Sequence, residues 1–336
     1  MTHKLLCIGG NGFVGSAICK TAISRGWQVH SLSRSGKPYA SDKGHQPAWS
    51  KRVNWHSGSA LEPDTYKHVL AECTAVVNAT GTLLEGDYKS GGISSLVKEL
   101  FNSRSNNPLA PGKAPRSKGQ YELLNRDAAL TVFRALQDTQ ELSSSTRSTP
   151  FVFISAEDIF RPFIPERYIA TKREAEQEMT RLVMARAFPS GDAPVEAGRD
   201  VRPVFLRPSL IYHPHIRPIS TLPAAMLDLS ATIQSKLPVP LRASAGAAIF
   251  ASLLPASTRN DLPPSAFSMS NLLSIPPIHV DTLAEAACRA IADESIEGAL
   301  GVQAMRDLVG WNTRSNTESE QRASEETQTP ANQPFS

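Results

Sequence analysis

The sequence predicts an α/β fold with a doubly wound parallel sheet, and three observations favour it. Short apolar runs recur along the chain, and segments with helical spacing of apolar residues separate them. The first apolar run ends in four closely spaced glycines. Hydrophobic residues make up 40% and charged residues 20% of the 336 residues. This composition is ordinary for a globular protein that buries a large core.

The first strand and the turn after it carry the most specific signal. Residues 4–8 are apolar, and Gly9, Gly12 and Gly15 follow at three-residue spacing before a helix over 13–25, which Gly26 closes. In this spacing one glycine makes the tight turn, one lets the backbone approach a pyrophosphate, and one lets the helix pack on the strand. Amide groups at the helix start then face the anion. The turn therefore predicts a Rossmann-type dinucleotide site formed by Gly9, Gly10, Asn11, Gly12, Phe13, Val14 and Gly15.

The same patterns predict the remaining elements. We expect strands at 27–33, 53–56, 75–79, 151–155, 202–206 and 278–280, and helices at 63–71, 121–138, 168–188 and 282–293. Segments rich in Gly, Ser, Asn and Pro interrupt this order near 86–120 and 189–200, and we interpret them as insertions.

The chain is expected to form one nucleotide-binding domain over residues 1–311. Beyond the strand at 202–206 the composition shifts to Pro, Ala, Ser and Leu, which favours a small cap, drawn mainly from 209–280, on the substrate side of the sheet. Residues 312–336 are rich in Ser, Thr, Glu, Gln, Asn and Pro, and we expect a disordered tail.

Charge and cysteine content limit the class of partner. The net charge is only +3, and the Lys and Arg residues are scattered, which argues against a nucleic-acid partner. Four isolated cysteines, Cys7, Cys19, Cys73 and Cys288, indicate buried free thiols in a reducing compartment. No apolar run reaches the roughly 18 residues of a membrane span, so we expect no transmembrane segment.

The first forty residues contain five Lys or Arg residues and no Asp or Glu. Such a basic, acid-free start is typical of mitochondrial import, and chance composition of a strand and helix explains it equally well. Because the first strand begins at about residue 4, we expect no cleavable presequence.

The end of the second predicted strand favours NADP(H) over NAD(H). An acid at this point would bind a free ribose 2′-hydroxyl, whereas this chain has Ser33, Arg34 and Ser35, with Lys37 close behind. A guanidinium pairs naturally with a 2′-phosphate. The alternative is that Arg34 only faces solvent or stacks on adenine.

Tyr168 and Lys172 lie four positions apart and share one helix face. A nearby cation lowers the pKa of a phenol, so Tyr168 could pass a proton to a carbonyl oxygen near neutral pH. Ser155 ends the preceding strand and could orient the same oxygen, and Asn125 could hold a water or backbone group near the lysine. The alternative for each residue is a position on a helix surface.

One further pattern suggests a metal. His213 and His215 flank Pro214, but no third ligand with suitable spacing accompanies them, so we expect a loop and no metal site.

Together these residues give the chain a resemblance to the extended or atypical short-chain dehydrogenases/reductases over about residues 4–305. The resemblance lies in 9–15, 33–37, 78–81, 168–176, 207–208 and 277–281. It is closest to the mitochondrial branch that includes the fungal ubiquinone-biosynthesis accessory protein and the NADPH-binding accessory subunit of complex I. One departure is Ser59, where many relatives carry an acid that contacts adenine.

The resemblance implies that Ala79, Thr80 and Gly81 line the nucleotide site and that Lys172 also anchors the ribose. It implies a protein on the matrix side of the mitochondrial inner membrane that works beside ubiquinone-biosynthesis proteins, and it implies no defined reaction.

Our leading hypothesis is an NADPH-binding protein that supports ubiquinone biosynthesis and reduces a carbonyl or quinone-like intermediate. The alternatives are a non-catalytic factor that holds the nucleotide in an inner-membrane complex, and a cytosolic NADPH-dependent reductase or epimerase.

Overall fold

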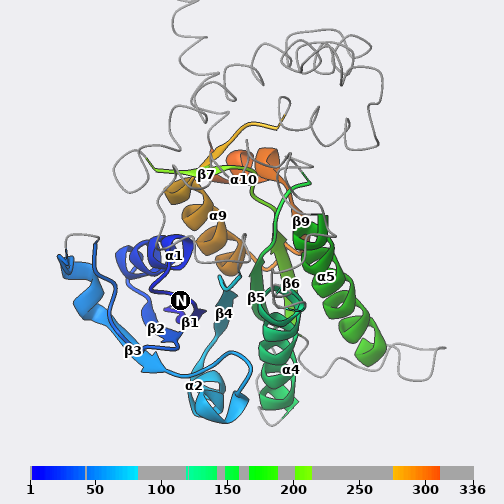
Figure 1. Cartoon of the computed structure of the whole chain (residues 1–336), viewed down its shortest axis with the longest axis horizontal. Helices are drawn as coiled ribbons and strands as arrows, with labels where there is room; N and C mark the ends of the chain where they lie inside the picture. Colours follow the sequence, from blue (N-terminus) through cyan, green and yellow to red (C-terminus); the bar gives the residue numbers. More distant parts are fainter. Residues whose placement is uncertain are drawn as a thin grey trace, which may run out of the picture.

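The computed structural model describes residues 2–41, 44–81, 119, 121–141, 148–158, 166–187, 201–213 and 275–310. These residues form three layers, with a sheet between two groups of helices (Figure 1). The layering confirms the predicted doubly wound α/β fold.

The sheet has seven parallel strands in the order β3-β2-β1-β4-β5-β6-β9. Their bounds are β1 Lys4–Ile8, β2 Gln28–Ser33, β3 Val53–Ser57, β4 Ala75–Asn78, β5 Thr149–Ile154, β6 Val201–Leu206 and β9 Gly298–Leu300. A separate parallel pair joins β7 (Ile211–Tyr212) to β8 (Ile278–His279). The order reverses direction between β1 and β4, which defines a switch point of the kind that binds ligands in open α/β sheets.

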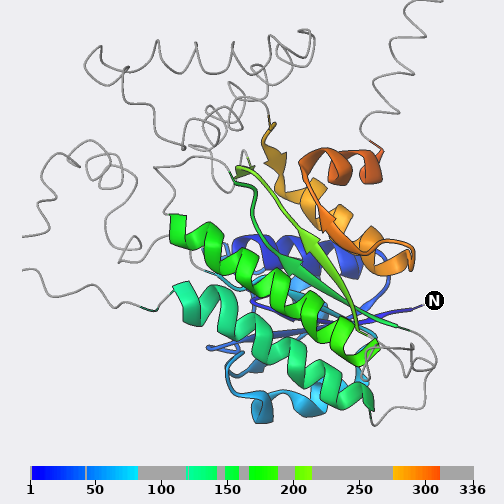
Figure 2. The same ribbon diagram turned by 90° about the vertical axis from the view of Figure 1, so that its right-hand side faces the viewer.

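Helices cover both faces of the sheet. One group is α1 Phe13–Ser24, α9 Val280–Ala292 and α10 Val302–Val309, and the other is α2 Lys67–Glu72, α4 Ala128–Glu141 and α5 Glu166–Ala187. Figure 2 shows α4 and α5 side by side in front of the sheet, with α1, α9 and α10 behind it. Shorter helical turns are η1 Ala48–Arg52, η2 Pro63–Thr65 and η4 Glu122–Asp127.

Alternation along the central strands divides the core between the two faces. Leu5 and Cys7 of β1 pack with α1 and α9, whereas Leu6 and Ile8 pack with α2, α4 and α5. All four β1 side chains are buried, as expected for a parallel strand covered on both sides. The four cysteines are free and buried, as predicted.

Several boundaries differ from the expectation. β5 starts at Thr149, so Pro150 lies inside a strand that we expected to begin at residue 151. The expected helix at 121–138 begins with the π-helical turn η4, and Val280 belongs to α9 instead of a strand. β7, β9 and α10 were not predicted, because two- or three-residue strands and an eight-residue helix carry too little periodicity to detect.

Some expectations fall outside the described residues. These are nearly all of the insertion at 86–120, the insertion at 189–200, most of the cap and the tail after residue 311. Within the described part of the chain, no helix combines the length and the apolar character that a membrane crossing requires.

The contact between β1 and α1 leaves no room for a side chain at Gly15. A Cβ there would lie 2.2 Å from the carbonyl oxygen of Gly9, a backbone atom that cannot move aside. At Gly12, which has φ −80°, the nearest atom would be 3.2 Å away.

We therefore predict that Gly15→Ala lowers the free energy of unfolding by about 1–3 kcal/mol, the usual cost of overpacking. Gly12→Ala is the matched control and should cost less than Gly15→Ala. Urea unfolding followed by circular dichroism measures both. Equal losses in the two variants would contradict the proposed crowding.

Candidate functional site

The candidate site lies at the carboxyl ends of β1 and β4, where the strand order reverses. The glycine loop follows β1, and residues Ala79, Thr80 and Gly81 follow β4. The fold thus brings two of the predicted nucleotide-binding segments to the two sides of one switch point. Ligands in open parallel sheets bind in this crevice.

The glycine loop has the geometry of a phosphate loop. Gly9 adopts φ +83°, a conformation that favours glycine, and the Gly12 amide donates to its carbonyl oxygen at 3.0 Å. Gly12 is the N-cap of α1, where it offers no side chain to the first-turn amides, and that turn contains no acid. A helix N-terminus arranged in this way favours an anion, so the loop fits a pyrophosphate.

The loop after β2 lies beside the glycine loop. The Asn11 side-chain amide donates to the Ser35 hydroxyl at 3.4 Å, which connects the two loops. Arg34 is exposed and, among the described residues, forms no ion pair. Its backbone carbonyl accepts a hydrogen bond from Ser57 at 3.0 Å, which ties the loop to the end of β3. A guanidinium in this position is available to a phosphate.

Ser59, the position where relatives carry an acid, has a local structural role. Its hydroxyl accepts the amide of Leu61 at 3.3 Å, and its carbonyl accepts the amide of Glu62 at 2.9 Å. Ser59 therefore stabilises the turn that leads into η2.

The end of β4 lies against two of the predicted catalytic residues. A Cβ built on Gly81 would lie 2.8 Å from Oδ1 of Asn125 and 3.3 Å from Nζ of Lys172. Asn125 is buried in the π-helical turn η4, a local distortion of a kind that is common at functional sites. Gly81, Asn125 and Lys172 thus converge, although they come from three separate segments.

Lys172 is buried, with 3% of its surface exposed. Its ammonium donates to the carbonyl oxygen of Ile154 at 2.7 Å and lies 5.5 Å from the centre of the Tyr168 ring. Burial lowers the pKa of Lys172 to about 8, and the negative charge of Glu176 partly opposes this shift. The pairing of Tyr168 and Lys172 on one helix face agrees with the i, i+4 spacing in the sequence.

The expected lowering of the Tyr168 pKa is wrong for this structure. Desolvation raises the pKa of the phenol, and Tyr121, whose ring packs edge-on at 6.2 Å, raises it further. The cost of burying a phenolate therefore outweighs the attraction of the lysine. Tyr168 is a neutral phenol at physiological pH.

Ser155 does not point its proton toward an open site. Its hydroxyl donates to the carboxylate of Glu176, which is buried with only 4% of its surface exposed. Arg173 donates to the same carboxylate at 2.7 Å, and Arg207 donates to it through two nitrogens. Arg173 also donates to the carbonyl oxygen of Ala156 at 2.9 Å. The single hydroxyl proton of Ser155 is thus engaged by a carboxylate that two guanidinium groups hold in place.

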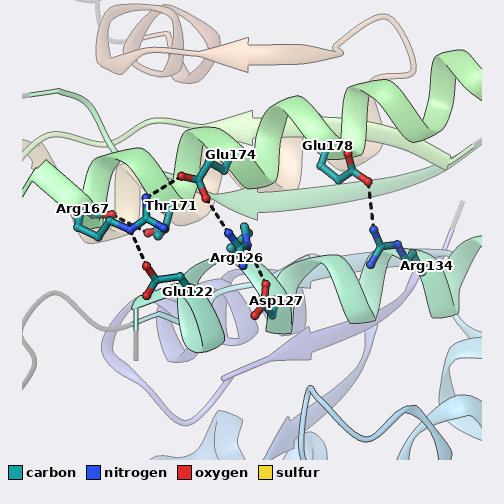
Figure 3. A network of polar contacts seen from close by, with 8 residues as sticks. All are labelled: Glu122, Arg126, Asp127, Arg134, Arg167, Thr171, Glu174 and Glu178. Carbon is teal, nitrogen blue, oxygen red and sulfur yellow. Dashed lines mark hydrogen bonds and ion pairs between the residues drawn. The ribbon is translucent and has the colours of Figure 1, made fainter. Parts of the chain in front are cut away.

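A ladder of ion pairs fixes α5 against η4 and α4 (Figure 3). Arg167 of α5 donates to Glu122 at 2.5 Å and to Glu174 at 2.9 Å, and Arg126 donates to Glu174 at 2.8 Å. Farther along, Arg134 donates to Glu178 at 3.1 Å. Single exposed pairs contribute little, but a network of this kind holds the helix of Tyr168 and Lys172 in register with Asn125.

Glu176, Arg173 and Arg207 organise the end of β5, and they are not among the site residues that the sequence predicts. A signal was present, because Glu176 follows Lys172 by one helical turn and Arg207 ends a predicted strand. Helical spacing shows that Lys172 and Glu176 share a face, but it does not reveal which strand that face meets.

The parallel sheet and the glycine loop define a Rossmann-type fold whose first loop fits a dinucleotide. Residues 5–90 match the NAD dependent epimerase/dehydratase family. MIOREX complex component 2 of Saccharomyces cerevisiae is 32% identical over 226 residues, covering 64% of this chain and 75% of the yeast protein. An uncharacterised chloroplastic protein of Arabidopsis thaliana is 26% identical over 309 residues, covering 91% of this chain and 77% of that protein.

Among solved structures, an oxidoreductase of the short-chain dehydrogenase/reductase family from Burkholderia thailandensis aligns with a TM-score of 0.49 at 15% identity, covering 90% of this chain and 91% of its own. The chain belongs to the same family as the yeast protein, and its residues 5–90 carry the match to the NAD dependent epimerase/dehydratase family.

The buried lysine predicts a pH dependence of stability. The pKa of Lys172 is about 8 in the fold and 10.5 in its ordinary state, so the unfolded chain binds the proton more tightly. The resulting penalty is fully present below pH 8 and is relieved as the pH rises from 8 to 10.5. Over this interval Lys172 should add roughly 3 kcal/mol to the free energy of unfolding.

The measurement compares the wild type with Lys172→Met by urea unfolding at pH 7, 8, 9 and 10. The difference in stability between the two proteins should shift in favour of the wild type as the pH rises. Cysteines and tyrosines also titrate in this pH range, but both proteins contain them, so their contribution largely cancels in the difference between the two free energies of unfolding. Lys37→Met, at an exposed position, is the control for loss of a lysine side chain.

Proposed function

We propose that the protein binds NADP(H) at the glycine loop and holds it as a non-catalytic component of a mitochondrial assembly that supports ubiquinone biosynthesis. The observation that carries the proposal is the hydrogen bond from Ser155 to the buried carboxylate of Glu176. A reductase of the type considered for the sequence needs this hydroxyl to donate to the substrate carbonyl. Here the proton is already bound to a stronger acceptor.

The surroundings of Ser155 keep it in this state. Glu176 is fixed by Arg173 and Arg207, and releasing Ser155 would leave a buried carboxylate with one hydrogen bond fewer. NADPH supplies a hydride when it is bound, but the residues around its site favour retention over turnover.

The preference for NADP(H) rests on the loop after β2. Arg34 is exposed beside Ser35, Ser35 contacts the glycine loop through Asn11, and no acid lies between Ser33 and Ser41. A 2′-phosphate at this point would meet a guanidinium, whereas a free 2′-hydroxyl would find no carboxylate to accept its proton.

Two lines support the cellular role. The resemblance of the glycine loop and of residues 168–176 to the fungal ubiquinone-biosynthesis branch favours the mitochondrial inner membrane, on its matrix side. The yeast relative is named as a component of a complex, which supports a role within an assembly. Ubiquinone-biosynthesis proteins are then the partners that we propose.

The second candidate is an NADPH-dependent carbonyl reductase. It is favoured by the position of the Lys172 ammonium, 5.5 Å from the Tyr168 ring and close to Asn125 and Gly81. In this case Tyr168 would donate the proton, Lys172 would assist it and anchor the ribose, and Ser155 would have to leave Glu176 to reach the substrate.

Cofactor preference can be measured by thermal shift. We predict a larger rise in Tm with NADPH than with the same concentration of NADH, and Arg34→Asp should erase or reverse the difference, because it replaces attraction to the 2′-phosphate by repulsion. Arg52→Asp makes the same charge change at another exposed position and should leave the preference intact. A wild type that is stabilised more by NADH would refute the role of Arg34.

Variants of the protein can be expressed in cells that lack the gene, and the recovery of ubiquinone levels then distinguishes a protein that only holds NADPH from one that oxidises it. Gly12→Asp places a negative charge where the pyrophosphate binds and should abolish rescue, whereas Gly12→Ala should retain most of it. Tyr168→Phe removes the phenolic proton and should still rescue fully. Ubiquinone is quantified by mass spectrometry with protein levels matched. If Tyr168→Phe fails as completely as Gly12→Asp, the protein is a reductase and the retention proposal is wrong.

A further inference from the structure

Three side chains with metal-binding atoms meet where β7 and β8 end. His213 directly follows β7, His279 is the last residue of β8, and Asp281 lies in the first turn of α9. One ring nitrogen of each histidine and one carboxylate oxygen of Asp281 all lie within 4.8 Å of one another. The two ligands that His213 needs in addition therefore come from a distant segment of the chain.

The separations suit a single small cation. Nδ1 of His279 lies 3.8 Å from Oδ2 of Asp281, and two ligands of a tetrahedral zinc ion are about 3.4 Å apart. The rings of His213 and His279 face each other with centroids 5.1 Å apart and a tilt of 37°. Small side-chain rotations would bring the three donor atoms to bonding distance, and the parallel pairing of β7 with β8 fixes the backbone on both sides.

Among the described residues, two groups compete with a cation at this position. The amide of Asp281 donates to Nδ1 of His279 at 3.2 Å, a long hydrogen bond that metal binding would replace. Lys20 lies 3.9 Å from Oδ1 of Asp281, but this pair is exposed and contributes little. The other carboxylate oxygen, Oδ2, faces His279. These two interactions lower the affinity of the site for a cation, but they leave a donor atom on each of its three side chains.

We propose that His213, His279 and Asp281 bind one Zn²⁺ ion. Two imidazoles and one carboxylate are a typical zinc donor set, with the remaining coordination position open to water or another ligand. Hard cations such as Mg²⁺ prefer oxygen ligands and are poorly served by two ring nitrogens. The site shares no residue with the glycine loop or with the group around Tyr168, and its test needs no bound nucleotide.

The position of the site suggests what zinc would do. His213 and His279 belong to the two chain segments on either side of residues 214–274. A metal that binds both segments adds a side-chain connection between them, beside the backbone pairing of β7 with β8. The ion would therefore fix the short β7–β8 pair and the start of α9 relative to one another.

Isothermal titration of the full chain with ZnCl₂ at pH 7.5, in a buffer that does not chelate zinc, tests the proposal. One ion per chain is expected, with a rise in Tm that MgCl₂ does not reproduce. His213→Ala, His279→Asn and Asp281→Asn should each weaken zinc binding at least about tenfold, since loss of even a supporting partner costs this much. Affinity should also fall at pH 5.5, because protonated imidazole cannot coordinate.

The variants include their own controls. Asparagine at 279 keeps a side-chain acceptor for the start of α9, and an unchanged circular dichroism spectrum with an unchanged Tm in the absence of zinc reports that each variant is folded. His45→Ala removes an exposed histidine elsewhere and should leave zinc affinity unchanged. Unchanged affinity in His213→Ala and His279→Asn would overturn the proposal. Loss of binding in His68→Ala alone would also overturn it, because it would assign the ion to a second set of histidines, in which the His68 ring lies edge-on to His56 and Nε2 of His56 lies 3.0 Å from Nδ1 of His30.

Discussion

The close approach of α1 to β1 is the constraint on which the arrangement of the site depends. Gly15 packs on the carbonyl of Gly9 with no space for a Cβ, and Gly9 turns the chain with a positive φ that glycine accommodates. This contact places the N-terminus of α1 at the carboxyl end of β1. The neighbouring strand β4 delivers Gly81 to the other side of the same switch point. A bulkier loop would move the helix start away from the place where a pyrophosphate fits.

Burial of charge organises the other side of the site. Lys172 and Glu176 lie on the same face of α5, and both are nearly inaccessible to water. Desolvation would penalise each charge alone, so each is surrounded by partners: a backbone carbonyl for Lys172, and Ser155, Arg173 and Arg207 for Glu176. The same partners restrict the chemistry. The Ser155 hydroxyl uses its proton in the hydrogen bond to the buried carboxylate, so that proton is not available to a substrate. The Tyr168 phenol stays neutral in this environment.

The nucleotide proposal and the zinc proposal concern separate parts of the fold. The first depends on the glycine loop, Arg34 and the residues around Ser155, and the second on the short pair β7–β8 and the start of α9. An experiment that contradicts one proposal therefore does not contradict the other. Both describe a chain in which bound groups stabilise the arrangement of segments, which fits a component of an assembly as well as an enzyme.

The sequence by itself determined the α/β class, the glycine loop and most strands of the sheet, because these depend on local periodicity and on the conformations open to glycine. It also placed Tyr168 and Lys172 on one helix face. Only the tertiary structure decided that Ser155 donates to Glu176, that burial raises the pKa of Tyr168, and that His279 and Asp281 supply partners for His213. Contacts between distant segments and the loss of water around a charge arise from packing. The spacing of residues along the chain therefore cannot predict these contacts or this desolvation.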